Sequence, residues 1–186
     1  MRRIIHNRCM TAKELLVQDA EYAWKELSQT LEGVKEAQAW SILPNLGGDY
    51  LHTDGSIQGI ALHIAGCKFM YGSISFRNTQ IRWREIAEQL DAFEPSWPAA
   101  LDYLNRAHEY WMASWADLSD ADLELPRPTN YDRDLPAWEM IRIVSLHDCY
   151  HAGQIAMLRF AAPETTTPPP SSAEDVRQYC RDSKAW

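Results

Sequence analysis

The stretch from Met140 to Leu158, MIRIVSLHDCYHAGQIAML, constrains the fold more than any other part of the sequence. Apolar residues recur in it at steps of three and four, the spacing of the buried side of an amphipathic helix. The same side carries His147 and His151, whose rings must project side by side from consecutive turns. A neutral imidazole among apolar side chains needs partners for both ring nitrogens, and a metal ion shared by two rings supplies one. The stripe consists of Met140, Val144, His147, His151 and Leu158.

Size, charge and cysteine usage restrict the classes of protein. A chain of 186 residues with 46% hydrophobic content is long enough for one domain with a sizeable core. The formal net charge of −8 gives no electrostatic reason to bind nucleic acid or an anionic membrane. No apolar run reaches the roughly 18 residues of a membrane-spanning helix, and the N-terminus lacks the apolar core of a signal peptide. Four scattered cysteines without a CxxC pair favour a reduced, cytoplasmic protein.

Turn and capping signals divide the chain into four long amphipathic helices. Thr11 with Glu14 has the capping-box pattern of a helix start, and Ser56 and Ser96 are suitable N-caps for the second and third helices. Pro136 is typical of a first helical turn and opens the fourth. The predicted helices cover about residues 11–33, 56–74, 96–118 and 136–162, with a short helical continuation of the first to about residue 43.

The connections are long after the second and third helices. The first of them is predicted to contain a short helix over 81–90, and its length is typical of a crossover or a functional segment. The second, 119–135, is rich in Asp and Pro and reads as a surface loop. No strand pair, hairpin or repeat is expected. The fold class is therefore all-α, a four-helix bundle with long connections between helices 2–3 and 3–4. The expected division is an extension (1–10), the bundle (11–162) and a Pro-rich tail (163–186).

His63 is the candidate third ligand, because it lies on the apolar stripe of the second helix. Bundles commonly build metal sites from side chains that face one another across the core. Three histidines with a water in the fourth position have the layout of a catalytic zinc-type site, whereas a hydrogen-bonded core histidine is the alternative for His63. The zinc-protease motif H-E-x-x-H is absent because residue 148 is Asp. Asp148 lies about 100° round the helix from His147 and is expected to face solvent, with an outer-shell role as the alternative.

Two cysteines and one more histidine require a choice of role. Cys67, one turn after His63, is either a fourth ligand that closes the site or, as we favour, a small buried hydrophobe. Cys149 is two residues from each histidine of the pair and is expected to point away. His108, on the core side of the third helix, is a ligand or general base in one reading. A hydrogen-bonded core histidine is the favoured reading.

Several other side chains have both a functional and an ordinary interpretation. Tyr71 and Tyr150 are hydroxyl donors to a substrate or simply packed aromatics. Lys68 and Arg142 are contacts for an anionic substrate group or ordinary solvated charges. The tryptophans of the third helix are expected in the core. A Trp-rich bundle face is also a candidate dimer interface.

The runs GIALHIAGCKFMY and HDCYHAGQI resemble the DinB/YfiT-like superfamily of small four-helix proteins. In that family a histidine on the second helix and an HxxxH pair on the fourth hold a divalent metal, zinc or nickel. Residue by residue the pattern falls on His63, His147 and His151, and Gly153-Gln154 matches the family's H-x-G-Q ending. The resemblance extends over about residues 10–160.

The resemblance implies a metalloenzyme. Characterised relatives include transferases and isomerases that use a low-molecular-weight thiol such as mycothiol or bacillithiol, and metal-dependent hydrolases. A metal with an open position activates a thiol or a water. The expected function is thiol transfer, with hydrolysis as the alternative; a non-catalytic stress or interaction protein with a structural metal is the hypothesis from another class. Homodimers are common in the family, so a homodimer is expected; nucleic-acid binding is disfavoured by the acidic charge.

Overall fold

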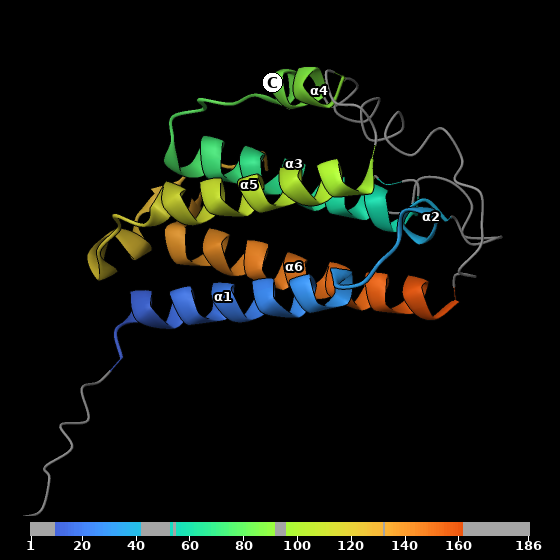
Figure 1. Ribbon diagram of the computed structural model, residues 1–186. Helices are drawn as coiled ribbons and strands as arrows, with labels where there is room; N and C mark the ends of the chain where they lie inside the picture. Colours follow the sequence, from blue (N-terminus) through green and yellow to red (C-terminus); the bar gives the residue numbers. More distant parts are fainter. Residues whose placement is uncertain (1–9, 42–52, 54, 92–95, 132, 162–186) are drawn as a thin grey trace, which may run out of the picture.

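The computed structural model describes residues 10–41, 53, 55–91, 96–131 and 133–161 and is an all-α bundle of four long helices, as predicted (Figure 1). The fold class is confirmed. The long helices are α1 (Ala12–Leu31), α3 (Ile57–Phe76), α5 (Trp97–Trp115) and α6 (Ala137–Ala161). The shorter elements are α2 (Glu36–Ala39), α4 (Trp83–Asp91), the 3₁₀ helix η1 (Asp120–Glu124), β1 (Pro126–Arg127) and β2 (Leu135–Pro136).

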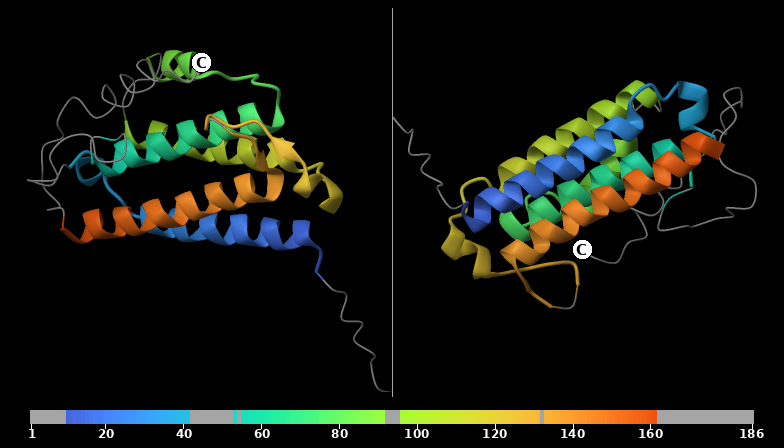
Figure 2. Two further views of the ribbon diagram at one scale, coloured as in Figure 1. Left: turned by 180° about the vertical axis from the view of Figure 1, so that it is seen from behind. Right: turned by 90° about the horizontal axis from the view of Figure 1, so that it is seen from below.

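The four long helices form two parallel pairs. Helices α1 and α6 run side by side in one direction, and α3 and α5 run side by side in the opposite direction (Figures 1 and 2). Because α3 and α5 are parallel neighbours, the chain must return along the length of the bundle between them. The connection that contains α4 makes this return, which confirms the crossover expected from its length.

Local sequence signals fix where the helices begin and end. The Thr11 hydroxyl accepts a hydrogen bond from the Glu14 amide (3.1 Å), and the Thr11 amide donates to the Glu14 carboxylate (2.9 Å). Gly33, in the left-handed region at φ 74°, separates α1 from α2, so the predicted continuation is a separate short helix. The end of that continuation, from residue 42 onward, lies outside the described residues.

Helix α3 is buried on nearly every side, from Ile57 to Ser73. The sequence predicts one buried stripe on this helix, whereas the structure buries residues on almost all of its sides. The reason is that α4 lies across the outside of α3, with its buried Trp83 and Ile86 packed near Gly66. A helix covered on all sides needs an almost uncharged sequence, and Lys68 is the one charged residue of α3.

The connection before α6 contains a short hairpin that the sequence analysis did not expect. Pro126 and Arg127 pair antiparallel with Pro136 and Leu135, and η1 precedes them. Two-residue strands have no alternating pattern to detect, so the expectation of no strands was wrong for a physical reason. The hairpin is tied to α3 because the Ser75 hydroxyl donates to the Pro128 carbonyl (2.8 Å).

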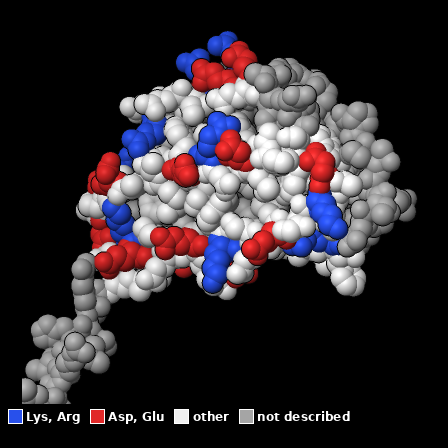
Figure 3. All heavy atoms as spheres, in the orientation of Figure 1, with Lys and Arg blue, Asp and Glu red and all other residues white. Residues whose placement is uncertain are grey.

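The surface carries both signs of charge. On the face drawn in Figure 3, acidic and basic side chains are interspersed without a large basic patch. No helix among the described residues has the length and apolar character needed to cross a membrane. The predicted N-terminal extension, apart from Met10, and the Pro-rich tail lie outside the described residues.

Candidate metal centre

Three histidines from two helices meet inside the bundle, as the sequence analysis required. His63 comes from α3, and His147 and His151 come from consecutive turns of α6. The Nε2 atom of His147 lies 3.1 Å from Nε2 of His63 and 3.0 Å from Nε2 of His151. His63 and His151 are buried, and His147 is partly buried. Three ring nitrogens are thus brought together from segments 84 residues apart in the chain.

Hydrogen bonding alone does not account for this arrangement. A ring nitrogen carries either one hydrogen or one lone pair in the plane, so Nε2 of His147 makes one good hydrogen bond, not two. It has two close nitrogen neighbours instead. A cation between the rings would accept a lone pair from each nitrogen. The nitrogens around a tetrahedral zinc are about 3.3 Å apart, close to the two separations found here. The donor set therefore fits a divalent metal.

Gln154 orients one of the histidines. Its side-chain oxygen accepts a hydrogen bond from Nδ1 of His151 (2.6 Å), and its amide nitrogen donates to the Tyr150 hydroxyl (3.2 Å). Since Nδ1 of His151 must carry the hydrogen, the lone pair lies on Nε2, the atom that faces the other histidines. Ligand histidines typically have such a partner. From the sequence, Gln154 is recognised only as part of the family ending; the signal for this role is its i+3 spacing from His151.

Cys67 also lies at the cluster. Its Sγ atom is 3.7 Å from Nε2 of His63, and the side chain is buried. One ligand atom from each of His63, Cys67 and His147 lies within 4.8 Å of the others. The favoured reading of Cys67 as a space-filling residue is consistent with its burial, but its sulfur is positioned as a potential fourth ligand as well.

Both histidines of α6 are held in the neutral state that metal binding requires. Burial lowers the pKa of His151 to about 4, although the Gln154 hydrogen bond opposes the shift. Burial, followed by the neighbouring charges of His151 and His63, lowers the pKa of His147 well below its ordinary value. At neutral pH their nitrogens therefore keep their lone pairs.

Asp148 does not face solvent, and the prediction that it does was wrong. It is 1% exposed, and its carboxylate lies 2.6 Å from the Nζ atom of Lys68, which is equally buried. Lys68 is therefore not a solvated charge, and it is too enclosed to contact a substrate. Burial lowers the pKa of Lys68 and raises the pKa of Asp148, and their mutual attraction opposes both shifts. Helix periodicity correctly places Asp148 about 100° round α6 from His147. In the bundle, that side of α6 faces Lys68 of α3 rather than solvent.

His108 is a packed histidine rather than a member of the cluster. Its ring stacks on Trp24 of α1, with centroids 3.9 Å apart and planes inclined by 6°. Its Nδ1 atom has no hydrogen-bond partner among the described residues, so the packed core position is as expected but a hydrogen bond at this atom is not found. Burial lowers the pKa of His108 to about 3. The ring is thus a neutral aromatic surface.

The remaining candidates lie around the cluster or away from it. Tyr71 is buried, and its hydroxyl lies 3.0 Å from that of Tyr131 in the hairpin connection. Tyr150 is half exposed, Cys149 is exposed, as predicted, and Arg142 is exposed on α6. The tryptophans of α5 are buried: Trp97, Trp111 and Trp115.

A hollow of about 370 Å³ lies between the hairpin connection and α6. It is lined by Tyr131, Arg133, Leu135 and Ile143. Ile143 precedes His147 by one turn of α6, a rise of about 6 Å along the helix axis. The volume is within the range of small-molecule sites.

Comparison with known proteins agrees with the resemblance found in the sequence. The family model of the DinB superfamily matches residues 19–155, which include all four long helices in whole or in part and all three histidines. No curated protein gives a significant match. A match over this share of the chain, together with the all-α bundle and the histidine cluster, leads to one conclusion: the chain belongs to the DinB superfamily.

Proposed function

We propose that this protein binds one divalent metal through His63, His147 and His151 and is a metalloenzyme of the thiol-transferase type. The observation that carries the proposal is the convergence of three Nε2 atoms at separations of 3.0 and 3.1 Å. When bound, the metal would supply a Lewis acid that lowers the pKa of a thiol or water in the fourth position. Zinc and nickel both suit an imidazole site.

The chain's own residues prepare this chemistry. Gln154 holds the His151 ring with its Nε2 atom directed toward His147. The hollow lined in part by Ile143, one turn before His147, would offer space for a small substrate. A low-molecular-weight thiol would bring the nucleophile, and the protein would provide position rather than a base of its own.

Two other functions compete with this one. A metal-dependent hydrolase would use the same ligands with a water in place of the thiol. A structural metal is favoured by one specific observation, the Cys67 Sγ atom 3.7 Å from His63 Nε2. Coordination by Cys67 would close the site, leaving a non-catalytic stress or interaction protein.

Elemental analysis of the purified protein beside a His151→Ala variant tests the metal. We expect about one metal per chain in the wild type and much less in the variant, with helical content retained. Unchanged metal content in the variant would remove the histidine assignment. Adding 2-mercaptoethanol to cobalt-substituted protein then separates the functions. A shift of the cobalt absorption bands supports an open, thiol-binding position, and no response supports a closed site.

A further inference from the structure

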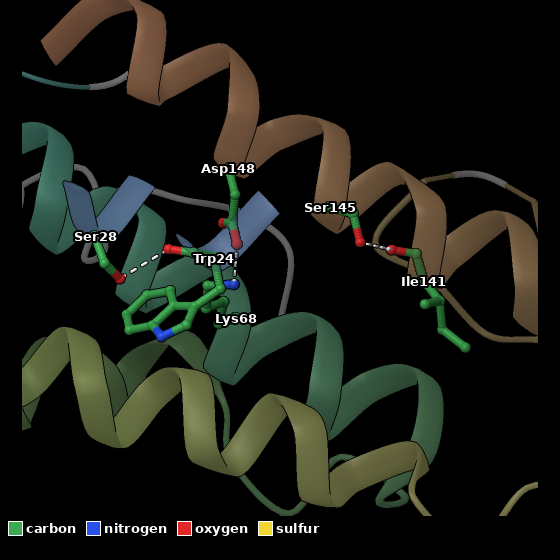
Figure 4. A network of polar contacts seen from close by, with 6 residues as sticks. All are labelled: Trp24, Ser28, Lys68, Ile141, Ser145 and Asp148. Atoms are coloured by element: carbon green, nitrogen blue, oxygen red, sulfur yellow. Dashed lines mark hydrogen bonds and ion pairs between the residues drawn. The ribbon is translucent and has the colours of Figure 1, made fainter. Parts of the chain in front are cut away.

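Each of the four long helices contributes one side chain to a layer beside the histidine cluster. Lys68 of α3 pairs with Asp148 of α6 at 2.6 Å (Figure 4). The Lys68 Nζ atom lies 5.6 Å from the ring centroid of Trp24 of α1, and that ring stacks on His108 of α5. The layer therefore connects all four helices at one level of the bundle.

This layer lies at the same height along the bundle as the candidate metal ligands. Lys68 directly follows Cys67, and Asp148 directly follows His147. A step of one residue turns a helix by 100° and advances it by 1.5 Å, so the ion pair points aside from the cluster but lies at its height. Sliding α3 past α6 by one residue, about 1.5 Å along the helix axis, would move the Lys68 Nζ atom away from the Asp148 carboxylate by about the same distance. The same sliding would separate His63 from His147.

Net stability is a poor explanation for this ion pair. Both side chains are almost fully buried, with exposed fractions of 1% and 2%. Removing two charges from water costs about as much as their attraction returns, and apolar replacements of similar volume are often equally stable. A directional contact such as an ion pair, unlike an apolar contact, is satisfied at only one lengthwise alignment, or register, of the two helices. Buried polar pairs that select a register are known for this reason.

We propose that the Lys68–Asp148 pair is a positioning device that sets the register of α3 against α6 and thereby holds His63 within reach of His147 and His151. This inference rests on the proposed metal site for its functional consequence. The register itself is a property of the metal-free protein, so it can be measured separately.

The central test is a double variant, Lys68→Met with Asp148→Val, which removes both charges together and leaves the net charge unchanged. We expect the thermal stability to be retained and zinc affinity, measured by chelator competition, to fall by about tenfold or more. In metal-free protein, the nuclear Overhauser effect between the ring protons of His63 and His147, whose centroids are 5.1 Å apart, should weaken or vanish.

Two further variants keep the result interpretable. Ser145→Ala is the matched control, because Ser145 is buried on α6 but its hydroxyl donates only to Ile141 of its own helix (Figure 4). It should leave zinc affinity within about twofold. Asp148→Asn retains an oxygen that accepts from Lys68, and should keep the ring contact and an affinity within about threefold of wild type. If the double variant fails to fold, Asp148→Asn still decides the question, because a tenfold loss of zinc affinity with the ring contact kept would overturn the positioning role.

The outcomes separate the two proposals. A double variant that keeps both the ring contact and the zinc affinity overturns the positioning role while the metal site stands. An Asp148→Asn protein that keeps the ring contact yet loses affinity tenfold shows that charge, not register, matters, and also overturns it. If wild-type protein binds no zinc, the proposed function fails. The positioning role is then judged only by whether the contact between the His63 and His147 rings is lost in the metal-free double variant.

Discussion

The Nε2 atom of His147 is crowded by the rings of the other two histidines of the cluster. It has two imidazole nitrogens within 3.1 Å, and its own Nδ1 has no hydrogen-bond partner among the described residues. His151, in contrast, has Gln154 to fix its orientation. Because the three rings are not equivalent, replacement of each should affect metal binding differently. His147 is the candidate ligand whose Nε2 atom lies within 3.1 Å of the Nε2 atoms of both others.

Cys67 is the residue that would decide whether the proposed metal site is open or closed, because its Sγ atom lies 3.7 Å from Nε2 of His63. If the three histidines suffice as ligands, Cys67→Ala should keep about one metal per chain and change zinc affinity by less than about tenfold. His147→Ala in the same assay should lose most of the metal. A fall of several hundredfold for Cys67→Ala would place the thiolate among the ligands and favour a structural metal. Thermal unfolding of the metal-free variants controls for the loss of a buried side chain.

His108 should contribute to acid sensitivity. Its pKa is lowered by burial from 6.5 to about 3 in the folded protein, so protonation favours the unfolded chain. Its contribution to stability is present above about pH 6.5 and is lost as the pH falls toward 3. His108→Phe keeps a ring against Trp24 without a titrating group. Between pH 7.5 and 5.5 the variant should lose about 1 kcal/mol less unfolding free energy than wild type, a value discounted for partial exposure. Equal losses in urea titrations would contradict this.

At the scale of the element, two glycines in α3 and α6 have opposite surroundings. A Cβ atom on Gly72 would lie 3.0 Å from the Tyr110 ring and 3.2 Å from the Ser114 hydroxyl, both on α5. A Cβ atom on Gly153 would meet nothing within 4 Å. Gly72 thus allows α3 and α5 to approach closely, whereas Gly153 only weakens its helix.

The same substitution should therefore have opposite signs in the two helices. Gly153→Ala is expected to raise the unfolding free energy by about 0.5–1 kcal/mol, the usual gain in helix propensity. Gly72→Ala is expected to lower it by about 1 kcal/mol, because contact with α5 outweighs that gain. Denaturant unfolding at one pH measures both. Stabilisation by Gly72→Ala would show that the Tyr110 and Ser114 side chains of α5 move at little cost to accommodate the added methyl group.

At the scale of the whole molecule, the exposed face of α6 is unusually apolar. Met157 is 68% exposed and Phe160 is 91% exposed, and Leu146 and Tyr150 continue the same side of the helix at steps of three to four and seven. The tryptophans of α5, in contrast, are buried in the bundle, so they are not available for a dimer interface. The homodimer expected from the family resemblance stays a prediction, and α6 is the surface on which to test it.

Met157→Glu should shift the molecular mass measured by light scattering from dimer toward monomer, because a charge on an apolar contact surface opposes association. Tyr22→Glu is a matched control, since Tyr22 is 63% exposed on α1. A wild-type protein that is monomeric at all concentrations, or a Tyr22 variant that dissociates as readily, would argue against α6 as the interface.

Much of the bundle follows from the sequence alone. The capping box at Thr11, the caps at Ser56 and Ser96 and the apolar spacing of α5 and α6 predict the four long helices, because these signals act within one or two turns of chain. The spacing of His147 and His151 also determines that their rings lie on one side of α6. The choice of His63 as their partner needed the general rule that bundle sites face inward, together with the family resemblance.

Only the tertiary structure decided which surfaces meet. The parallel pairing of α3 with α5, the cover that α4 gives to α3 and the short hairpin depend on contacts between distant segments. For the same reason Asp148 and Lys68 read as solvated charges until α3 and α6 are placed together, since periodicity gives the direction of a side chain but not what lies there. The sequence determined the helices and the candidate ligands; the packing of the helices decided which of their charges are buried.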